Sequence, residues 1–457
     1  MSSDHKTRSD VTILLLFIVD LIGVLGVFLI SFLIRLTWEF YPVVDLYFSL
    51  IPFSFCFPLI FYFSGLYKFG LPVPEEIKKL TVSSSFVFLV LGLFIFIYQS
   101  GNAISRAAYM ISWVLMLIFL PLFRALLREL FCKKPWWGET VVVLGQGSLL
   151  IEINRTIAEN PSLGFKVFDS IDLERTAEYK KKVLDIKKSG VTHLILALSE
   201  VDRAYFLEIL DYVSDHFGKL TLLSNLSGIS SLWSESRDFS GLLGFEIKQN
   251  LLSGQSILLK RLIDLTFIFL LFLPLLILFL AIPLLIRFTS RGGVFYGHKR
   301  VGIALQEFKA WKFRSMVENA DRILEVYLQA NPELRKEWQE AQKLQNDPRV
   351  TGVGNFLRRT SLDELPQIWN VLKGEMSLVG PRPITKEELN RYKDSAKLYA
   401  KVLPGMTGLW QVSGRSNTSY EQRIALDNYY VRNWSLWLDI YILARTFWVL
   451  LFRKGAV

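Results

Sequence analysis

Four hydrophobic runs of nearly bilayer length lie in the first third of the chain, and they constrain its fold more than any other feature. They cover residues 11–34, about 48–67, 80–98 and 109–123. A membrane-spanning helix needs about 20 mainly apolar residues. The first run is too long for a cleaved secretory signal, and no small-residue cleavage pattern follows it. The sequence therefore predicts a domain of four transmembrane helices over residues 1–134.

The basic residues around these runs predict how the helices are oriented. Many of them precede the first run, lie between the second and third runs, or follow the fourth. They are Lys6, Arg8, Lys68, Lys78, Lys79, Arg124, Arg128, Lys133 and Lys134. The opposite loops hold only Arg35 and Arg106. Because cytoplasmic loops carry an excess of Lys and Arg, we expect the N-terminus and everything after residue 131 to face the cytoplasm.

Composition narrows the classes of partner. The 457 residues carry a net charge of +10, which favours anionic partners such as lipid headgroups, nucleic acid or phosphorylated substrates. Cys56 and Cys132 cannot build a disulfide framework, so most of the chain is expected to be reduced and cytosol-facing. With only four scattered histidines besides, no zinc-ligand spacing is present and no structural zinc is expected.

Residues 135–250 predict a small parallel α/β domain of Rossmann type. Strand-like stretches at 140–144, 165–169, 193–198 and 219–223 are separated by intervals of helix length. The first runs into Gly145-Gln146-Gly147, glycines that could let the backbone approach a pyrophosphate. However, Leu150 replaces the third glycine of the dinucleotide fingerprint. A structural or regulatory module is favoured over nucleotide binding, which stays open.

A second type of membrane segment is expected at about 257–286. Residues 265–286 are apolar, but both flanks are basic: Lys260 and Arg261 before, and Arg287, Arg291, Lys299 and Arg300 after. A full span would leave one cluster on the wrong side of the membrane. Pro274 interrupts helix hydrogen bonding within the segment. We expect a re-entrant helix broken at Pro274, with a kinked fifth span as the alternative.

Basic residues beside glycine, proline or other turn-forming residues recur between 287 and 425. The clusters are His298-Lys299-Arg300-Val301-Gly302, Lys312-Phe313-Arg314-Ser315-Met316, Asp347-Pro348-Arg349, Arg358-Arg359-Thr360, Pro381-Arg382-Pro383 and Gly414-Arg415. Any one of them could simply be solvated or bind anionic lipid. Together they suit fixed phosphate contacts. No groove-reading motif accompanies them, so nucleic acid is not expected as a partner.

The segment Thr360–Gln367 has two interpretations. Ser361 and Glu364 form a capping-box pattern for a helix that would run to Lys373 and stop at Gly374. Alternatively, Asp363 and Glu364 are adjacent carboxylates among arginines, suited to holding a divalent metal or attacking phosphorus. Both can hold together, with Glu364 capping the helix while Asp363 projects outwards.

Five sequence blocks carry a resemblance to a known family. They are KRVG, FKAWKFRSM, NDPRVT, LRRTSLDELPQIWNVLKGEMSLVGPRPI and PGMTGLWQVSGR, all within 255–457. They closely resemble the bacterial polyprenyl-phosphate sugar-1-phosphate transferases, monotopic phosphoglycosyl transferases that initiate O-antigen, capsule and exopolysaccharide synthesis. The resemblance implies a mainly helical catalytic domain over 251–457 at the cytoplasmic face of the bacterial inner membrane. The four preceding spans and the α/β domain match the long form of the family.

The resemblance also implies the chemistry. Asp363 matches the aspartate that attacks the β-phosphorus of a UDP-sugar and releases UMP, and Glu364 matches its partner. Undecaprenyl phosphate then takes the phosphosugar from the enzyme, which is covalent catalysis. Among the long forms the resemblance is greatest to those that use galactose. The expected cofactor is Mg²⁺, with Asp363 as a metal contact. The resemblance assigns the binding of substrate phosphate first to Arg382, and after it to Lys299, Arg300, Lys312, Arg314 and Arg415.

Leu273 stands where the family commonly has a serine before the breaking proline. Aromatic and charged residues over 427–452 predict a helix lying in the membrane interface, with core packing as the alternative.

Besides UDP-sugar, undecaprenyl phosphate and membrane lipids, a second copy of the chain is a possible partner. The alternatives to sugar-phosphate transfer are a glycosyltransferase that releases UDP and a non-catalytic scaffold that senses nucleotide through residues 139–250.

Overall fold

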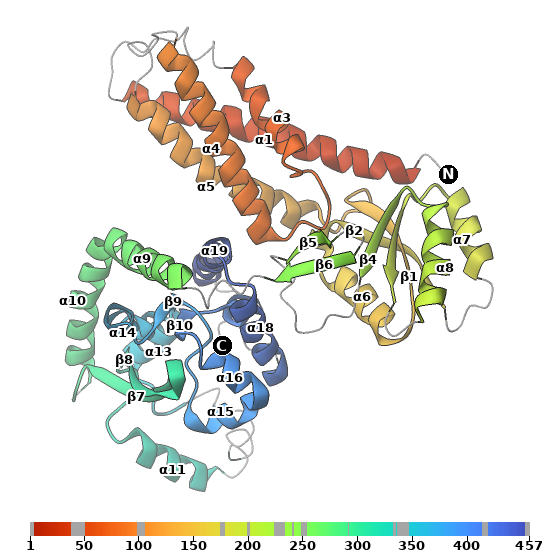
Figure 1. Cartoon of the computed structure of the whole chain (residues 1–457). Coiled ribbons are helices and arrows are strands. Elements are labelled where there is room, and N and C mark those ends of the chain that lie inside the picture. Colours follow the sequence, from red (N-terminus) through yellow and green to blue (C-terminus); the bar gives the residue numbers. More distant parts are fainter. Residues whose placement is uncertain are drawn as a thin grey trace. The chain divides into compact units, whose positions relative to one another are not determined.

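The computed structural model describes most of the chain. The described residues are 4–37, 51–97, 106–173, 179–198, 202–223, 234–239, 242–247, 254–290, 292–331, 335, 347–413 and 419–452. The chain divides into two compact units, Met1–Gly228 and Ile229–Val457. Figure 1 shows their elements: long helices and a sheet in the first, and a mainly helical arrangement with short hairpins in the second.

Apolar helices form the first part of the first unit. They are α1 (Asp4–Leu36), α3 (Cys56–Phe63), which follows the 3₁₀ turn η1 (Pro52–Phe55), α4 (Val73–Ile97) and α5 (Arg106–Phe131). In the described residues, α1, α4 and α5 are long and apolar enough to cross a membrane, whereas Pro52–Phe63 is a shorter apolar helix. The first, third and fourth predicted hydrophobic runs are therefore helical where they are described, and the second is helical over Pro52–Phe63 and ends in a turn. The second run begins outside the described residues.

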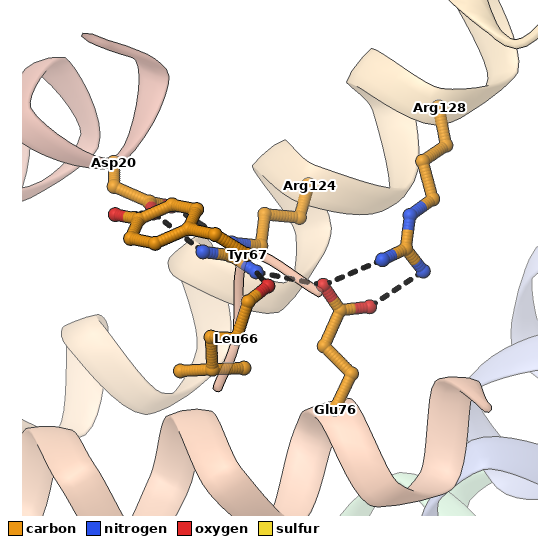
Figure 2. A network of polar contacts seen from close by, with 6 residues as sticks. All are labelled: Asp20, Leu66, Tyr67, Glu76, Arg124 and Arg128. Carbon is orange, nitrogen blue, oxygen red and sulfur yellow. Dashed lines mark hydrogen bonds and ion pairs between the residues drawn. The ribbon is translucent and has the colours of Figure 1, made fainter. Parts of the chain in front are cut away.

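A buried network of charges joins three of these helices (Figure 2). The guanidinium of Arg124 on α5 donates to Asp20 on α1 at 2.8 and 2.5 Å and to Glu76 on α4 at 2.9 Å. Arg128 also donates to Glu76, and the Tyr67 hydroxyl donates to Asp20 at 2.7 Å. The charges are two positive and two negative, so they compensate one another inside the bundle, where an unpaired charge is costly.

This network corrects the predicted place of two basic residues. Arg124 and Arg128 were expected in the loop after the fourth span, but both lie within α5. The Arg124 side chain is 1% exposed. It is paired with Asp20, which lies inside the first hydrophobic run, and with Glu76, which lies just before the third.

A parallel sheet follows the helices. Its strands β1 (Glu139–Gly145), β2 (Phe165–Asp172), β3 (His193–Ala197) and β4 (Lys219–Leu223) lie in the order β2-β1-β3-β4, all parallel. The helices between them are α6 (Gly147–Glu159), preceding the turn η3 (Pro161–Leu163), α7 (Tyr179–Lys188) and α8 (Arg203–Ser214). Alternate residues of β1 pack against opposite faces, one covered by α6 and the other by α7 and α8 (Figure 1). This agrees with the α/β arrangement predicted from the sequence.

One glycine of the predicted fingerprint has a packing role. A Cβ added to Gly145 would lie 2.4 Å from the carbonyl oxygen of Ala197 on the neighbouring strand. Strand pairing between β1 and β3 alone therefore requires glycine here, with or without a nucleotide.

The second unit opens with a hairpin and a broken helix. The hairpin strands are β5 (Ser234–Phe239) and β6 (Leu242–Ile247). Helix α9 (Gly254–Leu270) is followed directly by α10 (Phe272–Thr289), and Figure 1 shows the chain turning sharply between them. The turn lies at Leu271, whereas Pro274 occupies the first turn of α10. Backbone N–H groups have no partner within a helix at its first turn, so proline is tolerated there.

The remaining elements surround a short parallel strand pair. β7 (Phe295–Val301) and β8 (Glu307–Phe313) form an antiparallel hairpin around η5 (Ile303–Leu305), and β9 (Ser377–Val379) pairs with β10 (Gly405–Thr407). The helices are α11 (Ala320–Ala330), α13 (Gly352–Arg359), η6 (Leu362–Glu364), α14 (Gln367–Lys373), α15 (Lys386–Tyr392), η7 (Lys393–Ser395), α16 (Ala396–Tyr399), α17 (Leu409–Ser413), α18 (Tyr420–Arg432) and α19 (Leu436–Phe452).

Charged contacts attach α9 to the rest of this unit. Lys260 Nζ donates to Asp439 Oδ2 at 2.7 Å, and Tyr430 and Trp434 donate to the same carboxylate. One helical turn further along α9, Asp264 accepts a hydrogen bond of 2.7 Å from the Ser377 hydroxyl. These contacts tie the first part of α9 to α19 and β9.

Residues 427–452 differ from the single interfacial helix that was predicted. They form the end of α18 and α19, separated by a short turn. Trp434 and Asp439 are buried against Lys260, so for these two residues the core-packing alternative is correct. Phe447 on α19, in contrast, is 66% exposed.

Candidate active site

Asp363 and Glu364 lie on η6, a single 3₁₀ turn between α13 and α14. Ser361 just before it has a φ of +57°, which turns the chain sharply between α13 and η6. The Asp363 side chain is buried, and that of Glu364 is one-third exposed. The turn therefore holds the first carboxylate inside the unit and leaves the second partly accessible.

This geometry corrects the capping-box prediction. In the described structure, the Ser361 side chain caps no helix, because the residue is in the left-handed region and α14 begins only at Gln367. The Glu364 carboxylate pairs with a lysine, and Asp363 points inwards rather than outwards. The stop at Gly374 is confirmed, since this residue has a φ of +81° directly after Lys373.

Lys312 on β8 lies against the acid pair. Its Nζ donates to Glu364 Oε1 at 2.6 Å and lies 4.0 Å from Asp363 Oδ2. Lys312 and Phe313 are neighbours on β8, so their side chains lie on opposite faces of the strand. Phe313 is buried and packs against α10. The strand thus holds one ammonium group against two carboxylates.

The two carboxylates have oppositely shifted pKa values. Burial raises the pKa of Asp363 to about 6, with Lys312 acting against this and Glu364 adding to it. Burial also acts to raise the pKa of Glu364, but the charge and hydrogen bond of Lys312, together with Arg382 and Arg300, outweigh it and lower that pKa. Adjacent acids with pKa values driven apart are a common arrangement in catalytic sites.

The structure brings only some of the predicted basic residues to the pair. Arg300 donates to Glu388 at 3.2 Å and acts on Glu364 through its charge. Arg382 is half-buried with its guanidinium over the ring of Trp410. Arg314 instead donates to Ser290 at the end of α10, and the Lys299 side chain is exposed on β7. Arg415 lies outside the described residues.

Asn370 is a site-forming residue that the sequence analysis did not single out. It is fully buried on α14, accepts from the backbone N–H of Trp311 at 3.0 Å and donates to the carbonyl of Lys309 at 2.8 Å. These bonds hold β8, and with it Lys312, beside the turn that carries the acids. The only signal in the sequence is an amide within the apolar stretch Ile-Trp-Asn-Val.

A divalent cation fits the acid pair to a limited extent. Among the described residues, no three His, Cys, Asp or Glu side chains gather in a group that could hold a metal. Mg²⁺ often binds through one or two carboxylates plus substrate phosphates, so a complete protein cage is not required. Asp363 and Glu364 supply such a pair.

Comparisons with known proteins decide the family. The model of a family described as "Bacterial sugar transferase" matches residues 255–453. The chain is 36% identical over 409 residues to an undecaprenyl-phosphate galactose phosphotransferase of Salmonella typhimurium, covering 85% of this chain and 84% of the relative. This chain belongs to the bacterial sugar transferase family.

Two other relatives match different lengths of this chain. An exopolysaccharide production protein of Rhizobium meliloti is 50% identical over 179 residues, covering 39% of this chain and 79% of the relative. A UDP-glucose:undecaprenyl-phosphate glucose-1-phosphate transferase of Escherichia coli is 33% identical over 333 residues, covering 70% and 64% respectively. The matched family region, 255–453, contains all the acids and bases of the candidate site described above.

Proposed function

We propose that this protein transfers a hexose-1-phosphate from a UDP-sugar to undecaprenyl phosphate, and that Asp363 carries the sugar phosphate between them. The names of the relatives from Salmonella and Escherichia coli support transfer of a sugar phosphate to this lipid. The observation that carries the proposal is a buried Asp363 carboxylate beside an ionised Lys312–Glu364 pair.

In the first half-reaction, an oxygen of the ionised Asp363 attacks the β-phosphorus of the UDP-sugar. A bond forms between that oxygen and phosphorus, the bond from phosphorus to the bridging oxygen breaks, and UMP leaves with the electron pair. The pKa of about 6 keeps most Asp363 ionised near neutral pH while leaving it a stronger base than an ordinary aspartate. Lys312 is placed to offset the charge that develops on the phosphate oxygens.

In the second half-reaction, an oxygen of undecaprenyl phosphate attacks the same phosphorus. The Asp363 carboxylate leaves, and the product is undecaprenyl diphosphate sugar. Glu364, whose pKa is lowered, stays ionised throughout and holds the Lys312 ammonium in place. Asp363 and Glu364 are the residues that would hold Mg²⁺, which when bound neutralises charge on the phosphate oxygens.

The membrane arrangement is part of the proposal. The α9–α10 pair is a re-entrant helix entering the inner membrane from the cytoplasmic side, and the catalytic domain remains in the cytoplasm. Two features support this arrangement: the charged residues Lys260 and Asp264 are bound within the unit, and the α10 side chains Leu273, Ile277 and Leu280 are more than half exposed. An exposed apolar face of this kind suits contact with lipid.

Galactose is the sugar that we propose first, because the Salmonella relative is named for it. The Escherichia coli relative is named for glucose, so a panel of UDP-sugars is needed. The product would start a surface polysaccharide, such as O-antigen, capsule or exopolysaccharide, as the name of the Rhizobium relative supports. A homodimer is proposed for the oligomeric state.

The test compares wild-type enzyme with Asp363→Asn in purified, Mg²⁺-supplied form. We expect wild type to release UMP with donor alone and to acquire the mass of a hexose phosphate, and the variant to do neither. Release of UDP instead would indicate ordinary glycosyl transfer. UMP release by the variant would overturn the nucleophilic role of Asp363.

A further inference from the structure

Two arginines share one tryptophan ring in the second unit. The guanidinium of Arg382, in the loop after β9, lies 5.6 Å from the ring centroid of Trp410 on α17. The guanidinium of Arg423 on α18 lies 4.8 Å from the same centroid. Trp410 is 6% exposed, so its indole is a fixed support for both cations.

These arginines differ from three other arginines of the unit whose side chains are already engaged. Arg300 pairs with Glu388, Arg349 with Asp347, and Arg314 donates to Ser290. Within the described ranges, the side chains of Arg382 and Arg423 form no ion pair and no hydrogen bond. A ring contact orients a guanidinium without neutralising its charge or using its N–H donors. Both arginines therefore keep their donors for an anion.

Unsatisfied polar atoms gather on the same two helices. Arg423 Nε, Asp427 Oδ1 and Gln411 Oε1 are buried and lack a hydrogen-bond partner in the described part of the chain. Asp427 is 2% exposed and lies one turn after Arg423 on α18, with its other oxygen accepting from Tyr392 at 2.9 Å. A buried polar atom without a partner costs about 1–3 kcal/mol. Such a group of atoms is suited to binding a polar ligand.

Arg382 connects this cluster to the acid pair. Burial acts to raise the pKa of both Glu364 and Asp427, and the charge of Arg382 acts to lower both. Arg382 is thus within electrostatic reach of each carboxylate.

We propose that Arg423 and Trp410, together with Arg382, form a subsite for the sugar-nucleotide donor, in which the two guanidinium groups bind its diphosphate. This deepens the proposed function and rests on it. The chemistry of the cluster favours the donor over the lipid. Gln411 and Asp427 offer oxygen acceptors, which suit the hydroxyl groups of a ribose or hexose, and a polyprenyl phosphate has no such hydroxyls.

The test measures binding, so that it does not depend on turnover. In full-length Asp363→Asn protein in nanodiscs, the dissociation constant for UDP is compared before and after adding Arg423→Gln. Charge-assisted hydrogen bonds contribute about 1.5–3 kcal/mol, so we expect UDP binding to weaken about 10-fold or more. Arg423→Lys should recover part of the loss, because it keeps the charge but loses the planar fork.

Arg391→Gln is the matched control. Arg391 also lies over an aromatic ring, that of Tyr420, at 5.2 Å, and its side chain is exposed. It should leave UDP binding unchanged. Trp410→Leu should weaken UDP binding although both arginines are present, and thermal melting checks that this variant is folded.

The outcomes separate this inference from the proposed function. Unchanged UDP affinity in folded Arg423→Gln protein would overturn the subsite. Weakened binding of undecaprenyl phosphate with unchanged UDP binding would overturn it in favour of a lipid-phosphate site. If the Asp363→Asn parent failed to bind UDP at all, both the subsite and the proposed donor would be rejected.

Discussion

The ammonium of Lys312 lies 2.6 Å from the Oε1 atom of Glu364. Because this contact joins a strand residue to a residue on a 3₁₀ turn, it fixes the turn relative to β8. It also separates the roles of two neighbouring acids: Glu364 is neutralised by a dedicated partner, and Asp363, at 4.0 Å from the same lysine, is not.

Replacing Lys312 with methionine should slow UMP release and shift its pH dependence. Loss of one charge-stabilising donor typically costs about 10²-fold in rate. Since Lys312 lowers the pKa of Asp363, its removal should raise that pKa further above 6 and move the acidic limb of the rate profile to higher pH. The measurement is the initial rate of UMP release between pH 5 and 9. Lys309→Met, at an exposed position on β8, is the control and should match wild type.

The first half-reaction should depend on pH through Asp363 itself. Burial raises the pKa of this group to about 6, so the ionised nucleophile disappears as pH falls through that value. We expect the rate of adduct formation to fall about tenfold per pH unit below pH 6 and to be flat above pH 7. Rapid-quench measurement with donor alone reports this step. A rate independent of pH from 5 to 7 would contradict the assignment.

Ionisation of the buried Asp427 carboxyl should lower the stability of the folded protein as pH rises. Its pKa is raised to about 7 by burial, whereas in the unfolded chain it is near 4. The folded state therefore binds the extra proton between these values, and the stability associated with it is lost as pH rises from 4 to 7. Asp427→Asn should reduce the fall in melting temperature between pH 5 and 8. Asp185→Asn, on an exposed side chain of α7, should leave that fall unchanged.

Arg124→Gln should destabilise the helix bundle strongly. The substitution leaves Asp20 without its ion-pair partner in a buried site, and breaking a buried pair costs about 3–5 kcal/mol. Adding Asp20→Asn should restore part of the melting temperature, because no uncompensated charge remains there. Lys79→Gln removes a partly exposed pair with Glu75 and should have little effect. Equal melting temperatures for the single and double variants would show that the pair is not coupled.

The sequence predicted the fold best where a pattern is repeated many times. Hydrophobic runs predicted the N-terminal helices, and alternating strand and helix patterns predicted the parallel sheet. It predicted least well where one residue has two possible partners. Glu364 matches a capping box, but a lysine 52 residues earlier outcompetes the backbone for its carboxylate. Asp20 and Arg124 are ordinary charges near hydrophobic runs until the fold brings them together.

In the candidate site, too, the sequence predicted some residues and missed others. The motifs single out Asp363, Glu364 and Lys312, and the structure brings these three together. The contacts of Asn370 and Trp410 join distant parts of the sequence, so local patterns do not predict them. Similarly, Arg314 resembles the other clustered arginines in sequence but is engaged by Ser290 at the end of a different helix.

The separation of Asp20 and Arg124 along the chain has a consequence for how the protein is made. Asp20 is synthesised with the first helix, 104 residues before the arginine that neutralises it. During that interval the carboxylate must stay in contact with water, take up a proton or hold the helix short of full insertion. The carboxylate on the first helix therefore gains its ion-pair partner only after the last helix of the bundle has emerged from the ribosome.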